Sequence, residues 1–148
     1  DIKMNSFLGS ACFSLDHRKS LLISPDKGAK EKVKSASEYF ELEVVYAEKV
    51  RDTKTGQITD TTLSETYKVR NRDCVIVDDI CDGGGTFIPL AKKLKEAGAK
   101  TVTLYVTHGI FSKGLEPLKE HIDYLTPFQI IGNYVTMQDI KQFNERTR

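Results

Sequence analysis

The sequence predicts an α/β domain with an open, mostly parallel sheet of five strands flanked by helices. Short apolar runs alternate along the chain with longer segments of helical periodicity, which is typical of βαβ units. The run 74–77 is apolar at every position, as in strands that are buried on both faces. At 148 residues, the chain has the length of one domain.

The five strands are expected at 20–24, 42–46, 74–77, 101–106 and 122–131. The first ends at Pro25-Asp26. Residues 49–61 are polar with Gly56 in their middle, which predicts a mobile loop or the tip of a hairpin. A short extended piece, 63–69, is expected before the strand at 74–77.

Helices are expected at 29–40, 87–97 and 137–148, with a shorter one near 114–120. The segment 87–97 has an apolar face at helical spacing, formed by Phe87, Leu90, Ala91, Leu94 and Ala97. Pro89 is compatible with this helix because it falls in the first turn, and Gly98 provides a C-terminal stop. The segment 29–40 likewise places Val33, Ala36, Ser37 and Phe40 along one side.

Charge and composition exclude several classes of protein. The 22 Lys and Arg residues nearly cancel the 21 Asp and Glu residues, so the net charge of +1 favours neither nucleic acid nor a membrane as partner. No segment approaches the ~18 apolar residues of a membrane span, and no signal-peptide pattern is present. The three cysteines form no CxxC pair, which argues against a disulfide framework or a zinc site and favours a cytoplasmic location.

Two further expectations concern the cysteines and the start of the chain. Cys74 is expected in the core, and Cys81 in a loop that reagents can reach. The chain begins with Asp1 and a helix-like segment, which we interpret as the mark of a fragment.

The most informative segment is CVIVDDICDGGGT, residues 74–86. Asp78 and Asp79 follow the predicted strand, Asp82 opens a run of three glycines, and Thr86 starts the next helical pattern. Carboxylates at a strand end can hold hydroxyl groups or a metal, and a glycine loop before a helix exposes backbone N–H groups to a phosphate. The segment therefore predicts a site for a phosphorylated sugar.

The residues of this loop also allow or exclude other interpretations. A glycine cluster between a strand and a helix is also common as a plain turn. A calcium loop that starts at Asp78 fails, because its third position is Ile80 and its twelfth is Pro89. A nucleotide P-loop lacks its Gly-Lys-Ser/Thr, and the GxGxxG spacing of dinucleotide sites is absent.

Three motifs at three strand ends resemble those of one family. VIVDDICDGGGT (75–86) looks like the phosphoribosyl-diphosphate (PRPP) binding motif of type I phosphoribosyltransferase folds. ISPDKGAKEK (23–32) resembles the pyrophosphate-loop segment of the same folds. VTHGIFSKG (106–114) resembles a sequence that PRPP synthetases carry and that is not general among phosphoribosyltransferases. The chain thus resembles the C-terminal domain of ribose-phosphate pyrophosphokinase, over about residues 20–114.

The resemblance implies transfer of the diphosphoryl group of ATP to the 1-hydroxyl of ribose 5-phosphate, with Mg²⁺, giving PRPP and AMP. It implies that Asp78 and Asp79 hold the ribose 2- and 3-hydroxyls. The segment that binds the 5-phosphate would consist of Asp82, Gly83, Gly84, Gly85 and Thr86.

The same resemblance implies catalytic and diphosphate-binding residues. Lys49 and Arg51 stand where the synthetases carry a Lys-x-Arg pair on a flexible loop, and two cations would neutralise charge that develops during transfer. The diphosphate would be bound by Asp26, Lys27, Gly28 and Lys30. Asp26 is also a candidate Mg²⁺ ligand.

The chain departs from the family pattern in three ways. Gly83 replaces a threonine, which removes a hydroxyl donor from the phosphate loop, and the pyrophosphate loop lacks its second glycine and later arginine. Nothing corresponds to the N-terminal domain of the synthetases or its metal-binding histidine, and His17, His108 and His121 do not obviously replace that ligand.

These departures predict that residues 1–148 are the C-terminal half of a two-domain protein that forms homo-oligomers. The fragment alone is expected to be inactive. Two alternatives remain: a phosphoribosyltransferase that consumes PRPP, with residues 1–19 as the only candidate for a base-recognising hood, and a non-catalytic regulatory homologue.

Overall fold

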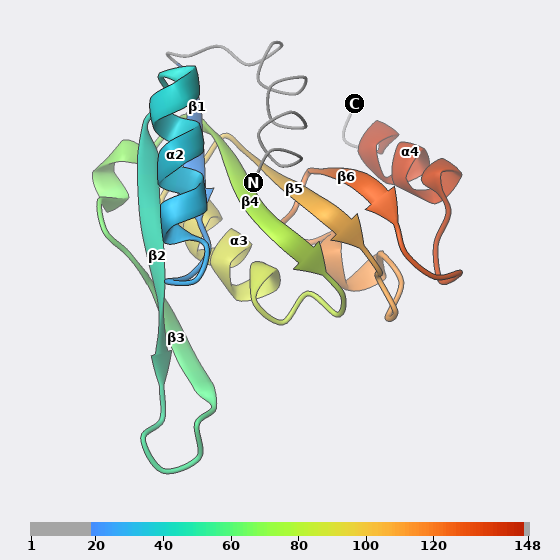
Figure 1. Ribbon diagram of the computed structural model, residues 1–148, viewed down its shortest axis with the longest axis horizontal. Coiled ribbons are helices and arrows are strands. Elements are labelled where there is room, and N and C mark those ends of the chain that lie inside the picture. The colour runs from blue at the N-terminus through green and yellow to red at the C-terminus, as the bar shows by residue number, and fades with distance from the viewer. Residues whose placement is uncertain (1–18, 147–148) are drawn as a thin grey trace.

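The computed structural model describes residues 19–146 and contains one sheet of six strands in the order β3-β2-β1-β4-β5-β6 (Figure 1). The strands are β1 (Ser20–Ser24), β2 (Val44–Arg51), β3 (Ile58–Leu63), β4 (Asp73–Cys81), β5 (Thr101–Gly109) and β6 (Tyr124–Ile130). All neighbours pair in parallel except β2 and β3. The predicted open, mostly parallel α/β sheet is confirmed.

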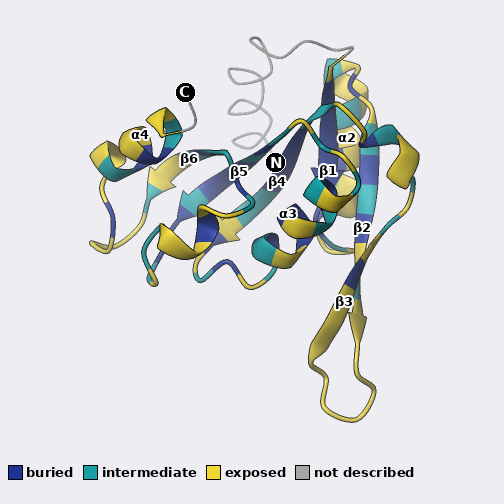
Figure 2. Ribbon diagram, turned by 180° about the vertical axis from the view of Figure 1, so that it is seen from behind, coloured by how far each residue is buried: buried dark blue, intermediate teal, exposed yellow. Residues whose placement is uncertain are grey.

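The predicted number of five strands is wrong by one. The polar segment 49–61 contributes the end of β2, a turn and the start of β3, so the hairpin interpretation is correct. Lys49 and Arg51 consequently belong to a strand and not to a loop. The hairpin projects beyond the sheet, and its outer part is exposed on all sides, which explains why it lacks an apolar pattern (Figure 2).

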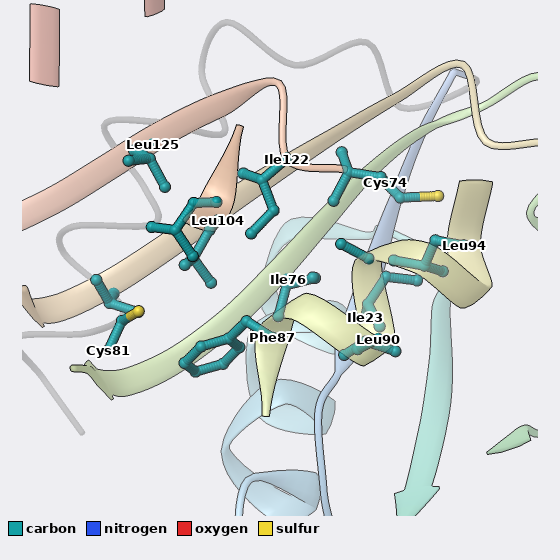
Figure 3. Packing of buried hydrophobic residues seen from close by; sticks show 14 of the residues in the cluster. Ile23, Cys74, Ile76, Cys81, Phe87, Leu90, Leu94, Leu104, Ile122 and Leu125 are labelled. Atoms are coloured by element: carbon teal, nitrogen blue, oxygen red, sulfur yellow. The ribbon is translucent and has the colours of Figure 1, made fainter. Parts of the chain in front are cut away.

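Helices cover both faces of the sheet, and each face has its own core. On one face, α2 (Lys30–Phe40) packs through Val33 and Ala36 against Leu22, Val75 and Val77. On the other, α3 (Phe87–Glu96) and α4 (Met137–Glu145) pack on a larger cluster, part of which is shown in Figure 3. Successive residues of β1 and β4 serve opposite cores, as expected of strands buried on both sides.

Several element boundaries differ from the prediction. Residues 66–68 form a short 3-10 helix, η1 (Thr66–Lys68), in place of an extended piece, and the helix near 114–120 is reduced to η2 (Glu116–Leu118). Both segments are too polar and too short for the sequence pattern to distinguish their form. No helix among the described residues is long and apolar enough to cross a membrane.

Candidate functional site

The site lies where the order of the strands reverses along the sheet. The chain passes from β1 outward to β2 and β3, then returns to the other side of β1 and continues through β4, β5 and β6 (Figure 1). In open α/β sheets, ligands bind at such a switch point, beyond the carboxyl ends of the strands. The loops after β1 and β4 meet there, and they carry two of the three sequence motifs.

The two aspartates of the central motif lie inside β4 and not after it. β1 accompanies β4 only as far as the pair Ile23 and Ile76, whereas β5 continues alongside it to Cys81. Asp78 and Asp79 therefore project beyond the end of β1, where a ligand can reach them. The apolar run 74–77 corresponds to the buried part of β4, and the two aspartates lie in the part that β1 no longer covers.

Asp78 is half-buried, and this burial raises the pKa of its carboxyl group above the ordinary value. The backbone N–H of Asp79 donates to Asp78 Oδ1 over 2.7 Å and acts in the opposite direction. The negative charges of Asp26 and Asp79 raise the pKa further, while Lys32 lowers it. The carboxylates from β4 and the β1 loop thus form one electrostatic cluster.

Lys32 is a site residue that the sequence interpretation missed. Its ammonium group forms a salt bridge with Asp79, which follows Val75 and Val77 on the α2 face of β4. Lys32 and Ala36 are four residues apart on α2, and Ala36 is buried against the sheet. The spacing to this apolar position could have indicated that Lys32 faces the site.

Asp26 is held from two sides in the loop after β1. Its Oδ1 accepts the backbone N–H of Ala29 over 3.0 Å, just before α2 begins, and its Oδ2 is 3.4 Å from Lys49 Nζ. Lys30, by contrast, places its ammonium 5.1 Å from the centre of the Tyr46 ring on β2.

A cavity of about 480 Å³ adjoins this loop. It is lined by Asp26, Lys27, Gly28, Glu48, Lys49 and Arg51. The structure thus brings together most of the predicted diphosphate-binding and catalytic residues. Lys49 is 17% exposed and turned toward Asp26, whereas the Arg51 guanidinium donates to the carbonyl of Gly56 in the hairpin turn over 3.0 Å.

The three glycines after β4 differ in how much room each position leaves for a side chain. Gly84 has φ +84°, and a Cβ there would lie 2.9 Å from side-chain carbons of Ile88 and Leu118. A Cβ at Gly83 would lie 3.3 Å from Cε of Lys113, and one at Gly85 would have open space. The carbonyl of Gly84 accepts the N–H of Ile88 over 2.9 Å, so the loop leads directly into the first turn of α3.

The loop after β5 supports the glycine loop. Asp82 Oδ1 accepts the backbone N–H of Ser112 over 3.0 Å, and hydrogen bonds from the Ser112 side chain and backbone lower the pKa of Asp82. The Cys81 carbonyl accepts the N–H of Ile110 over 2.9 Å. The side chain of Phe111 is buried and would clash with any side chain at Gly109, since a Cβ there would be 2.3 Å from Phe111 Cε2. The motif 106–114 therefore stabilises the predicted phosphate loop through hydrogen bonds to Cys81 and Asp82.

The expectation that Cys81 is reachable is wrong. Its side chain is buried at the end of β4 in the larger core (Figure 3), and this burial raises the pKa of the thiol to about 12. Burial also raises the pKa of Cys74 to about 12, in the core position that the sequence predicts. Cys12 and His17 lie outside the described residues.

The donor set suits a metal that is shared with phosphates better than one held by protein alone. Within residues 19–146, no group of three or more His, Cys, Asp or Glu side chains is placed to hold a metal ion. Mg²⁺ is commonly bound by one or two carboxylates together with substrate phosphates. Asp26, with Asp78 in its electrostatic neighbourhood, fits that arrangement.

Comparison with known proteins assigns the class. The model of the phosphoribosyl transferase domain matches residues 9–140, so the chain belongs to this family. Within it, the chain is similar to PRPP synthetases, since its curated relatives include ribose-phosphate pyrophosphokinases. It is 32% identical over 145 residues to the one from Mycoplasmopsis pulmonis, which covers 96% of this chain and 44% of the relative. It is 38% identical over 124 residues to the one from Pyrococcus abyssi, covering 83% and 42%.

Solved structures agree on the fold. The PRPP synthetase from Mycobacterium smegmatis superposes with a TM-score of 0.69 at 20% identity, over 84% of this chain and 39% of that one. The adenine phosphoribosyltransferase from Giardia lamblia also gives a TM-score of 0.69, at 14% identity over 88% and 78%. The chain spans less than half the length of the two curated relatives named above.

Proposed function

We propose that this domain binds ribose 5-phosphate and, in the full-length protein, takes part in Mg²⁺-dependent transfer of the diphosphoryl group of ATP to it, giving PRPP and AMP. The observation that carries the proposal is the meeting of the Asp78-Asp79 pair, the 82–86 loop and the Asp26 loop at the switch point of the sheet. Similarity to ribose-phosphate pyrophosphokinases supports the reaction type.

In this proposal, the two sides of the β4 end bind different parts of the sugar phosphate. The carboxylates of Asp78 and Asp79 accept hydrogen bonds from the ribose 2- and 3-hydroxyls. The backbone N–H groups of residues 83–86 and the N-terminus of α3 bind the 5-phosphate. Asp82 contributes by fixing the loop through Ser112.

The cavity beside β2 would receive the diphosphoryl group. Lys27, Gly28, Lys49 and Arg51 line this cavity and supply positive charge and backbone donors. Lys30 does not line it, and its ammonium group would have to leave the Tyr46 ring to bind the diphosphate. Asp26 would hold Mg²⁺ jointly with phosphate oxygens, and the ion would supply neutralisation of phosphate charge.

In the reaction itself, the 1-hydroxyl oxygen of the sugar bonds to the β-phosphorus of ATP. The bond from that phosphorus to the bridging oxygen of the α-phosphate breaks, AMP leaves, and the hydroxyl proton passes to solvent. Lys49 and Arg51 would stabilise the charge that develops on the transferred oxygens.

The lengths of the relatives support a full-length protein of two domains, in which a preceding domain would complete the ATP site. A homo-oligomeric state and a cytoplasmic location belong to the same proposal. The described domain alone would bind ribose 5-phosphate without turning it over.

The test is an incubation of the full-length protein with ribose 5-phosphate, ATP and Mg²⁺, followed by quantification of AMP and PRPP. Formation of both in equal amounts supports the proposal. Conversion of PRPP and a nucleobase to a nucleotide, without formation of PRPP from ATP, would establish the transferase alternative. Binding of ribose 5-phosphate without either reaction would identify a non-catalytic homologue.

A further inference from the structure

We infer that Lys113, in the loop after β5, binds the 5-phosphate of the sugar and positions it over the glycine loop. The end of the Lys113 side chain occupies the space that the absent side chain of Gly83 leaves open. The inference rests on the proposed function, because it assumes that the 82–86 loop binds a sugar phosphate. Neither the motif resemblance nor the charge pattern had assigned a role to Lys113.

The geometry at Gly83 carries the inference. The Lys113 side chain lies along this glycine, with Cε, Cδ and Nζ at 3.3, 3.4 and 3.5 Å from the point where a Cβ would be. Gly83 is not among the glycines with positive φ, so its backbone conformation does not demand a glycine. What its missing side chain provides is room for the end of Lys113.

The backbone that carries Lys113 is fixed by its neighbours. Ser112 donates its N–H to Asp82, and Gly114, at φ +74°, donates its N–H to the carbonyl of Phe111 over 2.9 Å. Phe111 is itself fully buried. The last carbons of the lysine therefore extend from an ordered turn directly onto the predicted phosphate loop.

The charge of Lys113 is available for a ligand. Lys32 and Lys49 are engaged with Asp79 and Asp26, whereas Lys113 is exposed and forms no salt bridge with any residue in the described range 19–146. Asp82 lies close enough for its negative charge to attract the Lys113 ammonium group. An ammonium group offers three donors, and a phosphate monoester beside it carries about 1.5 to 2 negative charges at neutral pH.

The test is a titration of the full chain with ribose 5-phosphate at several salt concentrations, monitored by calorimetry. Lys113→Met removes the charge and keeps the length of the side chain, and should weaken binding by about 10-fold, the effect of one charge-assisted hydrogen bond. It should also reduce the dependence of affinity on salt. Lys113→Arg should retain most of the affinity.

The matched control is Lys100→Met, which removes an exposed lysine just before the amino end of β5, at the opposite edge of the sheet from Lys113. It should leave both affinity and salt dependence unchanged. In the full-length enzyme, Lys113→Met should raise KM for ribose 5-phosphate with little change in kcat, which a merely structural defect would not produce. Gly83→Thr combined with Lys113→Ala, which empties the space beside Gly83, should restore part of the binding through the threonine hydroxyl group.

The outcomes separate this inference from the proposed function. If Lys113→Met binds ribose 5-phosphate as tightly as the native chain at every salt concentration, while Gly84→Ala loses binding, the phosphate loop acts without Lys113 and the inference is wrong. If the native chain does not bind ribose 5-phosphate at all, the proposed function is wrong, and the role of Lys113 is rejected with it.

Discussion

The two sides of the switch point are built in different ways. Around the loop after β1 and the start of α2, charged side chains are engaged with one another: Lys49 with Asp26, and Lys32 of α2 with Asp79 of β4. After β4, by contrast, the glycine loop depends on backbone conformation and on packing against the loop after β5. A ligand that binds the first region would have to displace these ion pairs, whereas the second region already has its backbone conformation.

This difference predicts whether a substitution in each region affects mainly activity or mainly stability. Partly exposed ion pairs of this kind contribute about 1 kcal/mol or less to stability, so their loss should affect ligand chemistry more than folding. A tightly packed turn with positive φ responds in the opposite way, because a wrong side chain there strains the fold itself.

The largest expected effect is on turnover, from Lys49→Met in the full-length protein. Removal of a cation that stabilises the transferred group should lower kcat by about 10³-fold, measured as AMP formation. Thermal unfolding should change little, because the Lys49–Asp26 contact is long and near the surface. Lys54→Met, at the exposed tip of the same hairpin, is the control and should retain full activity. Equal activity of both variants would remove Lys49 from the mechanism.

The next effect concerns the preformed side and compares two adjacent glycines. Gly84→Ala should lower the free energy of unfolding by about 3 kcal/mol, because φ is +84° and the new Cβ would be 2.9 Å from Ile88 and Leu118. Gly85→Ala, where nothing lies within 4 Å of the Cβ, should change it by about 0.5 kcal/mol or less. Urea unfolding curves measure both. Similar losses in the two variants would show that packing does not define this loop.

A third prediction uses the raised pKa of Asp78. Binding to ribose hydroxyls requires the ionised carboxylate, so the affinity for ribose 5-phosphate should fall with decreasing pH from a higher pH than an ordinary aspartate would give. The decrease should approach about tenfold per pH unit below that pKa. Asp78→Asn should bind weakly at neutral pH and lack this component. The difference between the two titrations cancels the ionisation of the phosphate group, and identical pH profiles would contradict the assignment.

Lowering the pH should weaken the binding of ribose 5-phosphate, but protonation of Asp78 should not destabilise the folded protein. Because the folded-state pKa of Asp78 lies above the unfolded value, the folded state holds this proton more tightly. The resulting contribution to stability is fully present at low pH and is lost as the pH rises through the folded pKa. Unfolding curves over the same pH range distinguish the two effects.

The smallest expected effect is on thiol labelling, because the cysteines of β4 should not react with reagents in the folded protein. Cys74 and Cys81 should remain unmodified by a disulfide reagent at pH 8, because both thiols are buried with a pKa of about 12. Peptide mass spectrometry identifies the modified positions, and both cysteines should react in urea. Rapid labelling of Cys81 in the native protein would show that the junction of β4 and the glycine loop opens.

The fold and the main motif could be predicted because local patterns report them directly. The apolar run before Asp78 and the apolar face of α3 result from burial, which leaves the same signature in the sequence as in the structure. The hairpin strand β3 could not be assigned in this way, since only Thr61 of its residues is buried. Strand pairing without burial leaves little periodicity to detect.

The site was predictable only in part, for a similar reason. Asp26, Lys49 and Asp78 each stand in a recognisable segment, and the parallel order of strands brings them together. Lys32 and Lys113 act across elements, one from a helix to a neighbouring strand and one from a loop to the next loop. Such contacts depend on the three-dimensional packing of segments that the sequence keeps 47 and 30 positions apart, as the Lys32–Asp79 and Ser112–Asp82 pairs show.

The bond from the Ser112 N–H to Asp82 also gives the protein a built-in reporter. While the two loops are joined, this amide is held against a carboxylate, and its hydrogen should exchange with deuterated solvent more slowly than an unbonded surface amide. Separation of the loops would release it. The exchange rate of one backbone hydrogen would thus follow the docking of the loops continuously, in the absence of any ligand.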